Sequence, residues 1–169
     1  MIHEVDEDVL SKSLDQYILT FDDGLYSQYR FFNTIKLIPT TKIFFISTGI
    51  VADEEIEQTN SYITSSKAHD MFFNNNDASS FMKWSQIKHI MSTPGCFIGG
   101  HSHYHQYKPT LSEMIDDTRK MCNTLMRNNV QTNKFCFPYN KEHSFYKPLL
   151  INHGFTDFYS TERSDISDL

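Results

Sequence analysis

The order of hydrophobic and polar positions predicts alternating strands and helices along most of the chain. Short runs rich in β-branched and aromatic residues predict strands over 17–21, 41–47, 96–99, 134–137 and 155–160. Apolar positions at helical spacing predict helices over 26–36, 112–128 and 145–152. A strand, a helix and a second strand in succession favour parallel pairing of the two strands.

This alternation predicts a single α/β domain covering residues 1–169, a length that is enough for one sizeable core. The polar motifs come just after the predicted strands, and in α/β folds that edge of the sheet carries the chemistry. Residues 52–80 break the rhythm, because they are mostly polar and contain three consecutive asparagines. They predict a long insertion near the site, since loops of this length in compact domains are usually functional or mobile.

Composition and charge exclude some classes of protein. A hydrophobic content of 39% fits an ordered globular domain, and a net charge of −6 argues against binding nucleic acid by broad phosphate neutralisation. The three cysteines are widely spaced, which indicates reduced, buried thiols. The acidic N-terminus has no apolar signal-peptide core, and no apolar run approaches the length of a membrane span. A cytoplasmic protein without a membrane span is therefore predicted.

Two adjacent carboxylates, Asp22 and Asp23, directly follow the first predicted strand. Because Asp-Gly is common in turns, one interpretation is a turn without a chemical role. Two carboxylates buried together are costly, since the like charges raise one of the two pKa values. At the carboxyl end of a strand, one of them could bind a cation while its neighbour stays free as a base.

Three histidines stand at alternate positions in the stretch IGGHSHYHQ, residues 98–106. On a strand, His101, His103 and His105 would all face the same way. On a helix or a tight turn, His101 and His105 share a face and His103 points elsewhere. Two glycines before His101 indicate that the strand has ended, which favours the turn. The alternative is a histidine-rich surface turn that binds no metal.

Several motifs together resemble those of a known family. The residues are LTFDDG at 19–24, WSQI at 84–87, CFIGG at 96–100, HSHYH at 101–105, FCFPY at 135–139 and GFT at 154–156. In this order they resemble the motifs of the polysaccharide deacetylases, carbohydrate esterase family 4, also called the NodB homology domain. The resemblance runs from about residue 17 to residue 161 and covers nearly the whole chain.

The resemblance implies an α/β fold of the distorted (β/α) barrel type with an open groove. It also implies removal of N-acetyl groups from amino sugars with one divalent metal ion, most often zinc, with cobalt or nickel as alternatives. Asp23, His101 and His105 would be the metal ligands. Such an Asp-His-His set leaves positions open for a water molecule and the amide oxygen of the substrate.

Further roles follow from the same resemblance. Asp22 would be the general base, and the backbone amide of Tyr139 would help to hold the developing oxyanion. Ser102 would steady the histidine loop, and Pro138 belongs to the same motif as Tyr139. Tyr104 and one residue of the 71–73 cluster are predicted in the substrate groove, and Trp84 is predicted to pack beneath the metal loop.

Two parts of the family pattern are missing from this sequence. Cys136 stands where the family usually has an arginine that orients and tunes the base. No counterpart of the fifth motif, which supplies an acid histidine, follows residue 160, so a shortened barrel is expected. His143 could donate the proton instead, although a solvated loop histidine is the simpler interpretation. Asp22, once protonated, could also return its proton, whereas His69 has no supporting pattern.

The favoured function is a metal-dependent N-deacetylase acting on a glycan or a glycan precursor. The alternative is a weak or inactive family member that binds metal and glycan without turnover. A phosphoesterase is disfavoured, because that chemistry often uses a second metal and no further carboxylate motif is present to hold one. Exposed strand at the open edge of the barrel makes a homo-oligomer plausible.

Overall fold

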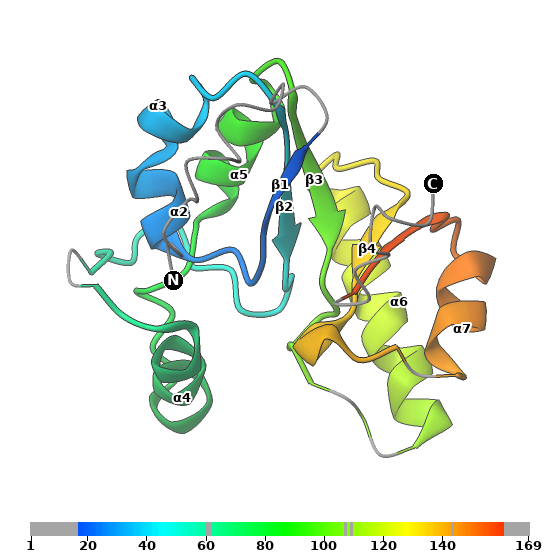
Figure 1. Ribbon diagram of the computed structural model, residues 1–169. Coiled ribbons are helices and arrows are strands. Elements are labelled where there is room, and N and C mark those ends of the chain that lie inside the picture. Colours follow the sequence, from blue (N-terminus) through cyan, green and yellow to red (C-terminus); the bar gives the residue numbers. More distant parts are fainter. Residues whose placement is uncertain (1–16, 60–61, 107, 109, 143, 161–169) are drawn as a thin grey trace.

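A computed structural model describes residues 17–59, 62–106, 108, 110–142 and 144–160 of the chain. Its centre is one sheet of five parallel strands that follow one another in sequence order (Figure 1). The strands are β1 (Ile18–Phe21), β2 (Thr41–Ile46), β3 (Cys96–Gly100), β4 (Lys134–Cys136) and β5 (Asp157–Tyr159). The sheet curls into a half-barrel with helices on its outer side, which confirms the predicted α/β fold of the shortened, distorted barrel type.

The helices outside the sheet are α2 (Tyr26–Arg30), α3 (Phe32–Ile35), α5 (Trp84–Met91), α6 (Leu111–Arg127) and α7 (Tyr146–Asn152). α6 and α7 occupy predicted positions, whereas no helix was predicted at α5. The single helix predicted over 26–36 is wrong, because the chain leaves helical geometry at Phe31. This break leaves Phe31 exposed and turns Phe32 into the core, where it is 2% exposed.

Helix α6 shows how the sequence fixes one of these elements. Thr110 Oγ1 accepts a hydrogen bond from the backbone N–H of Glu113, and the Thr110 hydroxyl donates to the Glu113 carboxylate. The first of these bonds satisfies a backbone N–H that would otherwise lack a partner at the start of the helix. The buried residues Met114, Thr118, Met121 and Leu125 then repeat at helical spacing and face the sheet.

The strands contribute to two separate apolar clusters. The larger cluster lies under the outer helices and includes Phe44, Ile46, Ile98 and Phe135. The alternate residues Ile43, Phe45 and Cys136 form a smaller cluster on the inner side of the half-barrel, with Tyr159 packed against it. β2 is buried along nearly its whole length, as expected for a central strand of a parallel sheet.

The insertion at 52–80 contains a helix that was not predicted, α4 (Ser65–Asn75). It begins at Thr64, whose side chain accepts a hydrogen bond from the backbone of Lys67, and ends at Asn76, which adopts a left-handed conformation with φ 54°. α4 lies beyond the carboxyl ends of β1 and β2 (Figure 1). No helix among the described residues is long and apolar enough to cross a membrane.

Candidate metal centre

Asp23 lies at the centre of the candidate site. The chain turns sharply after β1, with left-handed φ values of 72° at Asp23 and 74° at Gly24. Aspartate and glycine tolerate this conformation better than most residues do, so the sequence favours the turn at this point. The turn buries Asp23 to 7% exposure and brings its Oδ1 atom within 3.2 Å of His105 Nε2 and 3.5 Å of His101 Nε2.

The histidine loop is a turn and not a strand, in agreement with the favoured interpretation of its sequence. Ser102 and His105 both have positive φ, and the Ser102 hydroxyl accepts a hydrogen bond of 2.8 Å from the His105 backbone N–H. His101 and His105 therefore face Asp23. His103 is turned toward Thr48, with 2.8 Å between His103 Nδ1 and Thr48 Oγ1.

Hydrogen bonding fixes the orientation of His101. Its Nδ1 atom lies 2.8 Å from the carbonyl oxygen of Cys136, and the side chain is 2% exposed. A carbonyl can only accept, so Nδ1 carries the proton and Nε2 is left to face Asp23. Histidines that bind a metal through one ring nitrogen typically donate a hydrogen bond from the other nitrogen, often to a backbone carbonyl.

The loop after β2 supports the histidine loop from behind. The Ser47 hydroxyl donates to the His101 carbonyl at 2.9 Å, and the Gly49 N–H donates to the His103 carbonyl at 2.6 Å. A Cβ atom at Gly49 would lie 2.7 Å from the Tyr104 ring and 2.8 Å from the His103 carbonyl oxygen. The histidine loop therefore requires glycine at this position.

Gly49→Ala is expected to displace the histidine loop and to destabilise the protein by about 1–3 kcal/mol, the usual cost of overpacking. Thermal unfolding would show this as a fall in Tm of several degrees, together with weaker metal binding. Gly95→Ala is the matched control, since a Cβ atom at Gly95 meets nothing within 4 Å and only the left-handed φ of 75° is strained. Equal metal affinity in both variants would contradict the prediction.

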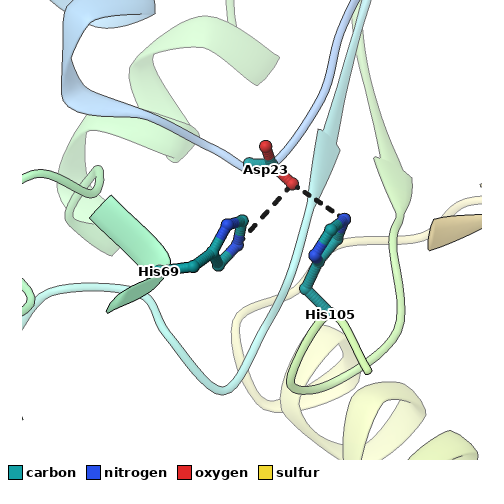
Figure 2. Close-up of side chains that lie close together, drawn as sticks. All are labelled: Asp23, His69 and His105. Atoms are coloured by element: carbon teal, nitrogen blue, oxygen red, sulfur yellow. Dashed lines mark ion pairs between the residues drawn. The ribbon is translucent and has the colours of Figure 1, made fainter. Parts of the chain in front are cut away.

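His69, for which the sequence gave no supporting pattern, lies at the site. It comes from α4, and its Nε2 atom is 3.8 Å from Asp23 Oδ1 (Figure 2). Its ring stacks on that of His105, with 4.4 Å between the centroids and 12° between the planes. The helical spacing of Ser65, His69 and Phe72 is a local signal for α4, but no helix was predicted within the mostly polar 52–80 segment.

A group of ligand atoms close enough to share a metal ion differs by one member from the predicted set. The candidate ligand atoms of Asp23, His69 and His105 all lie within 4.8 Å of one another, so His69 takes the place of His101 in that set. His101 nevertheless remains at the site through its contact with Asp23. One carboxylate is thus surrounded by three imidazoles among the described residues.

The electrostatics of the cluster favour a bound cation. Burial alone would raise the pKa of Asp23, but its contacts with His101 and His105 hold that pKa well below its usual value. Burial lowers the pKa of His105 to about 4 and also lowers the pKa of His69. The site therefore combines an ionised carboxylate with neutral imidazoles, the protonation states in which these groups bind a metal.

His101 behaves differently from the other two histidines. Burial would lower its pKa, but the close approach of Asp23 and the charges of Asp22 and Asp23 raise the pKa above its usual value. Those two carboxylates favour a positive charge at this place, whether it is a proton or a metal ion.

Three buried polar atoms of the cluster have no hydrogen-bond partner among the described residues. They are Asp22 Oδ1, Asp23 Oδ1 and His69 Nε2. Unpaired buried polar atoms are costly and call for a partner. A carboxylate and imidazole nitrogens are ligands that zinc commonly takes, so these residues fit a divalent metal ion.

Asp22 lies beside the cluster in contact with Cys136. Burial raises the pKa of Asp22, and the charge of His101 partly offsets this effect. The Cys136 thiol lies 3.7 Å from Asp22 Oδ2, and burial together with the charge of Asp22 raises the pKa of the thiol. Cys136, in the position of the family's arginine, thus contacts the predicted base as a neutral donor without a positive charge.

The remaining predicted residues are distributed as follows. Tyr139 has a φ of 56°, and its ring centroid lies 4.6 Å from that of His105. Pro138 is buried at the start of the short helix η2 (Pro138–Asn140). Tyr104 packs on the small cluster of Ile50, Ala68 and Phe81. Trp84 is half-buried against the main core, and His143 lies outside the described residues. The groove and support roles of these residues stay predictions.

Comparison with known proteins gives matches among solved structures only. No family model matches the chain, and no curated protein matches it. IcaB from Ammonifex degensii is 21% identical, with a TM-score of 0.63 over 85% of this chain and 58% of that one. A de-N-acetylase from Aggregatibacter actinomycetemcomitans is 13% identical, with a TM-score of 0.65 over 86% of this chain and 63% of that one.

A third similar structure is a pseudoenzyme of carbohydrate esterase family 4 from Bacillus anthracis. It is 15% identical, with a TM-score of 0.55 over 85% of this chain and 43% of that one, and a mutant of it is described as having restored enzymatic activity. The chain spans about three-fifths of the length of the first two structures it matches. These likenesses establish that the chain has the fold of the polysaccharide deacetylases of carbohydrate esterase family 4, as its motifs indicate.

Proposed function

We propose that this chain is a metal-dependent hydrolase that removes N-acetyl groups from amino sugars. The observation that carries the proposal is the convergence of an ionised carboxylate and imidazoles at Asp23, with a second carboxylate of raised pKa, Asp22, directly beside them. The deacetylases named among the similar structures support the choice of reaction. Zinc is the proposed ion, with cobalt and nickel as alternatives.

In the proposed mechanism, Asp23, His101 and His105 would hold the metal ion. When bound, the ion would polarise the amide carbonyl and lower the pKa of a water molecule. Asp22 would then accept the proton of the attacking water, a task that its raised pKa favours. The backbone N–H of Tyr139 would donate to the developing oxyanion.

Ser102 and Cys136 would act through other residues. The hydrogen bond from the His105 backbone to Ser102 holds the histidine loop in its turn. The Cys136 carbonyl fixes the ring of His101, while the Cys136 thiol contacts Asp22. A thiol supplies a weak hydrogen bond where an arginine would supply a full charge, so the base is tuned mainly by burial.

Cys136 also favours a second candidate function. With a thiol in the place of the arginine beside Asp22, the chain would bind metal and an acetylated glycan with little or no turnover. The family 4 pseudoenzyme among the similar structures makes this a concrete alternative.

The test is acetate release from N-acetylated amino-sugar oligomers by protein stripped of metal and then reloaded with zinc, cobalt or nickel. Stripped protein is expected to be inactive and reloaded protein to recover activity, because the ion is needed to polarise the carbonyl. Metal bound in a 1:1 ratio without acetate release would favour the glycan-binding alternative. Activity that survives stripping would contradict metal dependence.

Three further proposals concern oligomeric state, location and substrate. The β1 edge pairs only with β2 among the described strands, and Ile18 on it is 52% exposed, so self-association through this edge remains a proposal. Sedimentation of the protein over a range of concentrations would test it. The predicted cytoplasmic location and a glycan precursor as substrate are likewise proposals.

A further inference from the structure

His69 is held in place by aromatic packing on several sides. Its ring lies 6.3 Å from that of Phe73 and 5.5 Å from that of Phe81, in addition to its stack on His105. The neighbouring Ala68 is fully buried and anchors α4 on the cluster that contains Phe81. The imidazole is 12% exposed, so its position relative to Asp23 is set by the fold.

Ser65 determines which nitrogen of His69 carries the proton. The Ser65 hydroxyl donates its only hydrogen to Asp23 Oδ2. Ser65 Oγ also lies 3.4 Å from His69 Nδ1, and with its hydrogen already used it can only accept there. His69 Nδ1 therefore carries the proton, and Nε2 presents a lone pair.

The lone pair of His69 Nε2 faces the carboxylate. Nε2 is buried without a hydrogen-bond partner, and the nearest charged atom in the cluster is Asp23 Oδ1 at 3.8 Å, which also lacks a partner. His101 Nε2 also faces the carboxylate, at 3.5 Å from Asp23 Oδ1, while its Nδ1 donates to Cys136. Acceptor atoms that converge without hydrogens between them repel one another unless a cation lies among them.

Packing alone does not account for an imidazole at this position. A phenylalanine would make the same ring contacts without burying an unpaired nitrogen, which typically costs about 1–3 kcal/mol. The cost disappears if Nε2 binds a metal ion.

We propose that His69 is a fourth protein ligand of the metal ion, which completes a set of Asp23, His69, His101 and His105. This inference rests on the metal-binding part of the proposed function and extends the three-residue set that the sequence motifs imply. A ligand on α4 would also tie the 52–80 insertion to the carboxyl ends of the strands, so that metal binding and the position of this insertion become coupled.

The test measures metal binding directly, without substrate, on the full chain. Zinc affinity is determined by competition with a chromogenic chelator for wild type, His69→Ala and His69→Phe. His69→Phe keeps the aromatic packing and removes only the nitrogens. Both variants are expected to bind zinc at least about 10- to 100-fold more weakly, because losing a direct ligand should cost no less than losing a group that supports a ligand. The visible absorption of bound cobalt is expected to change in His69→Phe.

His89→Ala is the matched control. His89 is also a helical histidine in contact with aromatic rings, Tyr29 and Phe32, but it lies outside the Asp23 cluster. Its variant is expected to keep wild-type affinity and cobalt absorption. Hydrogen exchange gives an independent result, since metal is expected to protect the amides of α4 in wild type and His89→Ala but not in His69→Phe.

The outcomes separate this inference from the proposed function. Wild-type zinc affinity and an unchanged cobalt spectrum in His69→Phe would show that His69 only packs against His105, and would overturn the inference alone. A wild-type protein that binds neither zinc nor cobalt would overturn the inference and the proposed metal-dependent function together.

Discussion

Asp22→Asn is expected to lower the rate of acetate release by about 10²- to 10⁴-fold, the usual contribution of a general base. The amide has nearly the same shape as the carboxylate but cannot accept a proton from the attacking water. Asp22 is not among the proposed ligands, so zinc affinity is expected to stay close to that of wild type. The measurements are the rate of acetate release at saturating zinc and the zinc affinity of the same preparation.

Asp53→Asn is the control for this experiment, since it makes the same chemical change at an exposed aspartate. It is expected to leave the rate unchanged. A rate for Asp22→Asn equal to that of wild type would show that another group removes the proton. The result also bears on Cys136, which contacts Asp22 in the place of the family's arginine. An active wild type and an inactive Asp22→Asn variant would show that Asp22 acts as the base without an arginine beside it.

Asp23→Asn is expected to abolish tight metal binding, and activity with it. Asp23 supplies the negative charge that its contacts with His101 and His105 keep ionised. Its loss should weaken zinc binding by more than the roughly 100-fold that supporting groups of a metal site contribute. Titration with zinc, followed by calorimetry or chelator competition, measures the change.

The stability of Asp23→Asn without metal shows how far the substitution affects folding as well as metal binding. Asn adopts the left-handed conformation at least as readily as Asp, so the turn at φ 72° is preserved. Without metal, the variant is expected to unfold somewhat below the wild-type Tm, because the contacts that hold the Asp23 pKa low also stabilise the folded state. Wild-type zinc affinity in this variant would place the metal ion elsewhere.

The periodicity of the sequence determined most of the fold. All five strands of the sheet were predicted within two residues at each end, because parallel strands buried by helices appear as short apolar runs between polar segments. The α6 and α7 helices were predicted within one residue at each end, since each shows a clear apolar stripe. The break at Phe31 was not visible, because it depends on which of two adjacent phenylalanines enters the core.

The sequence also determined which residues of the two main motifs would meet. One motif has two consecutive aspartates after a strand, and the other has two histidines four positions apart after two glycines. The local backbone conformation of each motif depends mainly on its own residues. The left-handed turn at Asp23 and the Ser102 contact to His105 are both short-range features. The spacing of the histidines predicted that His101 and His105 share a face, and the resemblance to the deacetylase motifs implied that Asp23 joins them.

Only the tertiary structure decided the place of His69 and the surroundings of Asp22. His69 is separated from Asp23 by 46 positions, and it reaches the site because α4 packs on the Phe81 cluster. Cys136 contacts Asp22 because the inner side of the half-barrel brings β4 opposite the turn after β1. Contacts across such distances depend on how helices and strands pack, which no local pattern of residues records.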